Sequence, residues 1–139
     1  MKRNISRIKA MMVLYSKEIN ENYEELNALY DLDIDLQANE DFVNELVLGV
    51  SKYKKEIDFI ISTNLEHYTI SRLNFVDQAI IRIAVYEMKY TNTPHNIIIN
   101  EALEISHEYS ETMDDQSSKF NNSVLDKISK KISWMSKNI

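Results

Sequence analysis

Apolar residues recur along this chain every three to four positions, which is the spacing of amphipathic helices. The pattern is strongest over residues 73–87, where apolar side chains mark two faces of one helix. A helix that is apolar on two faces is covered on two sides, so this segment is predicted to be the central helix. Asn74 is a good N-cap with Asp77 three residues on, and Asn92 and Pro94 set the helix end near residue 90.

The remaining pattern predicts further helices around the central one. They are expected at residues 5–19, around 26–30, from 41 to about 65 as one helix or a kinked pair, from Thr93 and Pro94 through 105, and from 120 to 135. Residues 97–99 have β propensity, but the sequence that follows favours helix. Residues 31–39 and 110–118 are polar and predict loops. Gly49 interrupts a helical stretch at a cost of about 1 kcal/mol, so a close helix crossing is predicted there.

Composition narrows the fold class. With one Gly and one Pro in 139 residues, tight β-turns are hard to build, so we predict an all-α single domain of six to seven helices. A hinge at residues 64–71 divides it into helical halves 1–66 and 67–139.

The absence of cysteine excludes disulfides and thiolate metal sites. No apolar run reaches the roughly 20 residues of a membrane span, so we expect a soluble, cytoplasmic protein without membrane contact.

Charge is segregated along the chain, although the net charge is only −6. Residues 1–17 hold five basic residues and no acidic one, and residues 119–139 hold five lysines and one aspartate. From residue 18 to residue 51 there are ten acidic residues and no basic one. Basic ends around an acidic middle predict two different partner surfaces. If the two basic ends lie side by side in the fold, they form one positive groove.

Catalytic patterns are weak. Glu104 and His107 form an E-x-x-H step, as in di-iron bundles, but such sites need a second step and two more glutamates, so a solvated surface pair is favoured. The chain has no HExxH motif and too little glycine for a phosphate loop. We therefore expect that the protein is not an enzyme and that it binds no cofactor and no metal.

Asn100 and Glu101 are polar residues within an apolar helix. We expect their side chains to pair with the polar groups at the end of a neighbouring helix or to form an ion pair, for which Arg82 is a candidate.

The start of the last helix has the parts of a single-stranded RNA site. Lys119 suits a phosphate, Phe120 suits base stacking, and the amides of Asn121 and Asn122 suit base edges. Core packing of Phe120 is the alternative interpretation, since that residue also starts an apolar stripe.

An ordered set of residues along nearly the whole chain has the spacing of a known family. The set comprises Arg7, Ala10, Leu14-Tyr15, Leu48-Gly49-Val50, Val76-Asp77, Ile81-Arg82, Ala84, Tyr86-Glu87, Pro94, Ile99-Asn100-Glu101-Ala102, Glu104, Ser117, Lys119-Phe120, Asn122 and Val124-Leu125-Asp126-Lys127. This set resembles the NusB family of bacterial transcription antitermination factors.

The resemblance implies two packed helical subdomains and a non-catalytic adaptor that promotes transcription of ribosomal RNA operons. NusB-like proteins bind single-stranded boxA RNA together with NusE, a ribosomal protein, and join the RNA polymerase antitermination complex; some form homodimers and others are monomers. By position, the resemblance implies two groups of binding residues in this chain. The residues expected to bind RNA are Lys2, Arg3, Arg7, Lys119, Phe120 and Asn122, and those expected to bind the partner protein are Asp77 and Glu101.

The chain also departs from the family pattern. Asn4 and Ile5 interrupt the basic cluster of the first helix, Ser123 replaces a typical glycine, and Gln116 replaces an expected acidic residue. Fewer basic residues release fewer counterions, so we expect modest RNA affinity that NusE raises. Two alternatives remain: a detached NusB-like domain of a ribosomal RNA methyltransferase, although no Rossmann half is present, and a purely structural helical module.

Overall fold

The computed structural model describes residues 2–19, 37–66, 69–110 and 116–137. Within these ranges it contains six α-helices, one 3-10 helix and no strand, which confirms the all-α prediction. The predicted helix around residues 26–30 lies outside the described residues, as does most of the acidic loop. The helices are α1 (Lys2–Ile19), α3 (Glu40–Lys52), α4 (Lys54–Thr63), η2 (Ile70–Arg72), α5 (Phe75–Tyr90), α6 (His95–Tyr109) and α7 (Gln116–Lys137).

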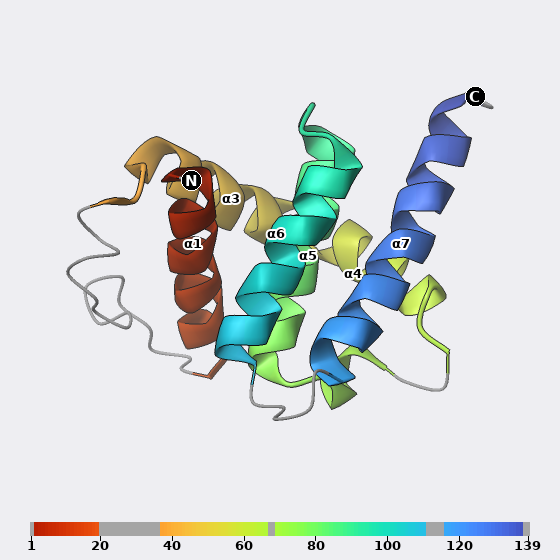
Figure 1. Ribbon diagram of the computed structural model, residues 1–139, viewed down its shortest axis with the longest axis horizontal. Helices are drawn as coiled ribbons and strands as arrows, with labels where there is room; N and C mark the ends of the chain where they lie inside the picture. Colours follow the sequence, from red (N-terminus) through yellow and green to blue (C-terminus); the bar gives the residue numbers. More distant parts are fainter. Residues whose placement is uncertain (1, 20–36, 67–68, 111–115, 138–139) are drawn as a thin grey trace.

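Helix α5 is the central helix, as predicted. It packs against α1, α3, α4, α6 and α7, and residues 77–88 are all buried (Figure 1). The side chain of Asn74 accepts a hydrogen bond from the N–H of Asp77 at 2.8 Å, which confirms the predicted N-cap. Thr91 ends the helix in an extended conformation ahead of Pro94.

The stretch from residue 41 to 65 folds as a kinked pair of helices. Tyr53 separates α3 from α4 with non-helical dihedral angles, φ −104° and ψ 19°. Its ring stacks on Tyr90 of α5, with ring centroids 4.2 Å apart. Aromatic stacking on the central helix therefore holds the break in place.

Two predicted helix starts were wrong by a few residues. Pro94, rather than Thr93, occupies the cap position of α6. Helix α7 begins at Gln116, four residues before the predicted start at Phe120. The apolar pattern on which the prediction rested begins only where α7 reaches the core, so it missed the polar first turn.

Helices α1, α6 and α7 lie across one face of the molecule, with α6 between the other two (Figure 1). Helices α1 and α6 run in one direction and α7 runs in the opposite one. We call the end of the molecule where α1 and α6 end and α7 begins the lower end. The first turn of α1 therefore lies at the end opposite to the first turn of α7.

Gly49 allows α3 to approach α5 closely, which confirms the predicted crossing. A Cβ atom at this position would overlap the ring of Tyr86, with Cε1 and Cζ as its nearest neighbours. The Tyr86 side chain is itself buried, so it has little room to move aside. The packing of the ring therefore requires the absence of a side chain at residue 49.

We expect Gly49→Ala to lower the free energy of unfolding by about 1–3 kcal/mol, because overpacking outweighs the better helix propensity of alanine. Urea denaturation measures this. Asn44→Ala, at an exposed position of the same helix, is the matched control and should be neutral or slightly stabilising. Equal stability of Gly49→Ala and the wild type would contradict the close crossing.

Candidate nucleic-acid interface

The two basic ends of the chain do not form the single groove predicted from the sequence. Arg3 lies in the first turn of α1, whereas Lys119 and Phe120 lie near the start of α7, at the other end of the molecule (Figure 1). The prediction was wrong because α1 and α7 run in opposite directions on either side of α6. Lys2 begins α1, but its side chain lies outside the described residues.

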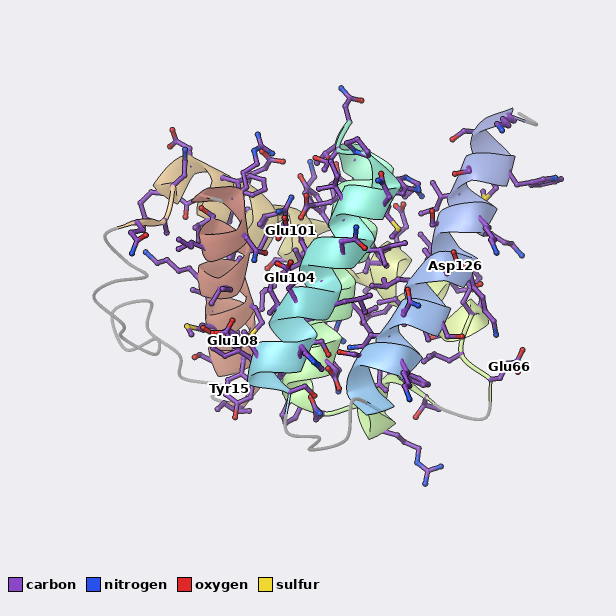
Figure 2. The ribbon with its side chains drawn as sticks, viewed as in Figure 1. Tyr15, Glu66, Glu101, Glu104, Glu108 and Asp126 are labelled. Atoms are coloured by element: carbon purple, nitrogen blue, oxygen red, sulfur yellow. The ribbon has the colours of Figure 1, made fainter. Side chains whose placement is uncertain are left out.

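The surface of α6 between these two regions is acidic. Glu101, Glu104 and Glu108 project from α6 toward the same face of the molecule (Figure 2). We call these three residues the acidic ridge. Its negative charge repels phosphate groups, so it separates the basic start of α1 from α7 electrostatically.

Aromatic side chains from three helices lie at the lower end, where the end of α6 separates the end of α1 from the start of α7 (Figure 1). Tyr15 lies near the end of α1 (Figure 2), Tyr109 is the last residue of α6, and Phe120 lies in the first turns of α7. All three aromatic side chains are half-buried, while Lys119 and Asn122 are exposed. The half-buried ring of Phe120 and its exposed neighbour Lys119 have the chemistry to stack on an unpaired base and to bind phosphate.

The sequence prediction did not include Tyr15 or Tyr109 among the site residues. Tyr15 fits the apolar stripe of the first helix, so its spacing indicated core packing. Only the folded arrangement, in which α1 ends at the same end of the molecule at which α7 begins, shows that Tyr15 belongs to the lower end (Figure 2).

A buried polar cluster holds the start of α7 against α5 and α6. The Nδ2 of Asn121 donates to Oδ1 of Asp77 at 3.0 Å and to Oγ of Ser106 at 3.1 Å. Ser110 donates to Oδ2 of Asp77 at 3.3 Å. Asp77 was expected on the partner side, but it is only 5% exposed and contacts other helices of the same chain. The cluster fixes the position from which Lys119 and Phe120 are presented.

Arg7 is also an interior residue rather than a surface one. Its Nε donates to Oε1 of Glu87 at 2.6 Å and its Nη2 to Oε2 at 2.8 Å, and the two side chains are 5% and 1% exposed. Burial alone lowers the pKa of Arg7, but the hydrogen bonds and charge of Glu87, together with the charge of Glu101, raise it above its ordinary value. Arg7 is therefore always charged and already engaged.

Arg82 pairs with carboxylates other than Glu101, so the ion pair that the sequence offered as one alternative for Glu101 is not the one observed. Nε of Arg82 donates to Oδ1 of Asp58 at 2.8 Å, and Nη1 donates to Glu18 at 3.2 Å. Arg82 faces α4 and the end of α1 because it lies on the side of α5 away from α6. Glu101 instead acts on Arg7, whose pKa its charge raises.

Among the described residues, no group of three or more histidines, aspartates and glutamates is placed to hold a metal ion. Glu104 and His107 are both exposed on α6. In the same part of the chain, no helix combines the length and the apolar character required to traverse a bilayer.

Comparison with known proteins points to one family. The sequence pattern of the NusB family matches residues 4–130. The transcription antitermination protein NusB of Bacillus cereus (strain B4264) is 41% identical over 130 residues, covering 92% of this chain and 97% of that protein. The solved structure of T. maritima NusB superposes with a TM-score of 0.75 at 26% identity, covering 94% of this chain and 92% of that one.

A solved complex of the antitermination factors NusB and NusE with double-stranded RNA has the same fold. The matched chain gives a TM-score of 0.74 at 24% identity, covering 94% of this chain and 97% of that one.

We expect Glu87→Gln to lower the free energy of unfolding by about 3–5 kcal/mol, because it leaves the Arg7 charge buried and unpaired. The double variant Arg7→Met/Glu87→Leu should recover much of that loss, since both charges are then removed. Urea denaturation of the three proteins measures the difference. A loss below about 1 kcal/mol in Glu87→Gln would contradict the assigned pair.

We expect Asn121→Ala to cost about 1–3 kcal/mol, because Asp77 and Ser106 lose a buried hydrogen-bond donor. Hydrogen exchange of the first turns of α7 should also become faster. Asn122→Ala is the matched control, since the neighbouring side chain is exposed and its loss should be within about 0.5 kcal/mol. Equal effects of the two substitutions would contradict the anchoring role of Asn121.

Proposed function

The chain belongs to the NusB family, and we propose on that premise that it is a transcription antitermination factor. In this proposal it binds single-stranded boxA-type RNA together with NusE and brings the pair to RNA polymerase. It acts as an adaptor without catalysis, in the cytoplasm where transcription takes place. Relatives that are 41% identical over nearly their whole length are named transcription antitermination proteins. These names support the proposal over the methyltransferase-domain and purely structural alternatives.

One observation supports the RNA-binding part of the proposal, namely the exposed Lys119 next to the half-buried ring of Phe120 at the start of α7. A base stacks on the Phe120 ring while Lys119 binds phosphate. The Asp77 and Asn121 cluster holds this surface in position before RNA arrives, which reduces the ordering cost of binding. Asn122, exposed on the next turn of α7, offers an amide to a base edge.

The basic residues of α1 have separate roles in this proposal. Arg3 and Lys2 lie at the far end of α1, roughly 25 Å from its last turn at the usual helical rise. They therefore contact RNA only when it extends beyond the lower end. Arg7 positions α1 through Glu87 and does not itself contact RNA.

We assign the protein partner to the acidic ridge, which includes the predicted partner residue Glu101. Three carboxylates on one side of a helix complement a basic protein surface and disfavour RNA. Asp77 supports this side indirectly, because it accepts a hydrogen bond from Ser110 at the end of α6. Formation of a homodimer stays a prediction for this chain.

We expect Lys119→Glu to weaken binding of a short boxA-type single-stranded RNA roughly tenfold and to reduce the salt dependence of binding, because one phosphate is no longer neutralised and a repulsive charge is added. Fluorescence anisotropy of labelled RNA, with and without NusE, measures both. Lys55→Glu, at an exposed lysine of α4 outside the proposed site, is the charge-matched control.

Sequence preference completes the test. The wild type should prefer boxA-type RNA to a scrambled strand, and NusE should raise the affinity. Equal binding of the two RNAs, with Lys119→Glu and Lys55→Glu behaving alike, would contradict the proposed function and favour a structural module.

A further inference from the structure

The outward face of α7 is basic along its length and ends in an exposed tryptophan. At about 100° per residue, Lys119, Lys130 and Lys137 fall on the side opposite to the buried residues Asn121, Leu125 and Ile128, with Lys127 at the edge of that side. Trp134 lies on the same side, with 63% of its surface exposed. All five lysines of α7 are exposed, but Lys131 lies at nearly the same angle as the buried Val124.

Little negative charge opposes these lysines. Lys130 pairs with Asp126 at 3.0 Å and Lys127 pairs with Glu66 at 3.1 Å, beside α7 (Figure 2). Both pairs are exposed, and exposed ion pairs are weak. A phosphate group can therefore replace either carboxylate at small cost. Asp126 is the only acidic residue in α7.

The last turns of α7 lie on the surface. Residues 133–137 are all exposed, and within them only Met135 and Trp134 are large and apolar. They also lie beyond residues 4–130, the part of the chain that matches the family pattern. An exposed tryptophan between lysines has the chemistry to stack on a base while the lysines bind phosphate.

We propose that the outward face of α7 from Lys127 to Lys137 is a second contact surface for single-stranded RNA. It binds the segment that continues from Lys119 and Phe120, and Trp134 stacks on a base roughly 22 Å further along the helix. This inference rests on the proposed function, since it extends the same RNA. The continuity of one exposed basic face with Lys119 and the pairing of lysines with an aromatic ring favour RNA as the occupant.

Trp134 is the only tryptophan of the chain, so its fluorescence reports this surface directly. The experiment titrates the full chain with three RNAs. One is a short boxA-type strand, and the other two are the same strand lengthened by about eight uridines at one end or at the other, enough to span the helix face. One of the long strands should quench the Trp134 emission and bind more tightly than the short strand, which should leave the emission nearly unchanged. Trp134→Ala should weaken binding of that long strand roughly fivefold or more and leave the short strand unaffected.

The matched control is Phe59→Ala, which removes an aromatic side chain that is 69% exposed on α4. Lys130→Ala/Lys137→Ala should reduce the salt dependence for the long strand alone, by roughly 0.7 for each phosphate that is no longer neutralised. Short-strand binding that depends on Lys119, with no quenching by either long strand, would overturn this inference while the proposed function stands. Emission that shifts with anionic phosphatidylserine vesicles but not with RNA would overturn it in favour of a membrane surface. Failure of all three strands to bind would overturn the inference and the RNA-binding function together.

Discussion

The buried ion pair between Arg7 and Glu87 is the interaction on which the arrangement of this molecule depends. It joins the first helix to the central helix through two hydrogen bonds in a region closed to water. A buried pair of this kind adds little net stability, but each partner is costly without the other. It therefore selects one placement of α1 on α5 over alternatives with similar apolar contacts. That placement carries Tyr15 to the lower end of the molecule.

A second buried polar contact performs the same task for the last helix. The hydrogen bond between Asp77 and Asn121 joins the start of α7 to the start of α5. The positions of α1 and α7 are therefore both fixed relative to one central helix. Helix α6 lies between them and turns its acidic ridge to the surface (Figure 2). The charge segregation along the sequence thus becomes a segregation in space. In the proposed function, RNA binds at the start of α7 and a basic protein binds at α6.

The helices and their packing could be predicted from the sequence because periodicity reports which face of a helix is apolar. The cap at Asn74, the crossing at Gly49 and the central position of α5 all follow from that information and were confirmed.

The roles of Arg7 and Asp77 could not be predicted in this way. Both lie at the edge of an apolar stripe, where a charged residue either faces water or meets a buried partner from a helix far away in the sequence. The partners Glu87 and Asn121 are 80 and 44 residues distant, and no local pattern links them. The relative direction of α1 and α7 was missed for the same reason, since periodicity says nothing about how distant helices are oriented.

The central claim is that RNA binds at the start of α7 and avoids the acidic ridge. Backbone amide chemical shifts in the ¹⁵N-labelled protein, recorded during titration with boxA-type RNA, test this claim most directly. The account predicts the largest changes at Lys119, Phe120 and Asn122, with small changes at Glu101 and Glu104. Large changes along α6 with an unaffected α7 would contradict it.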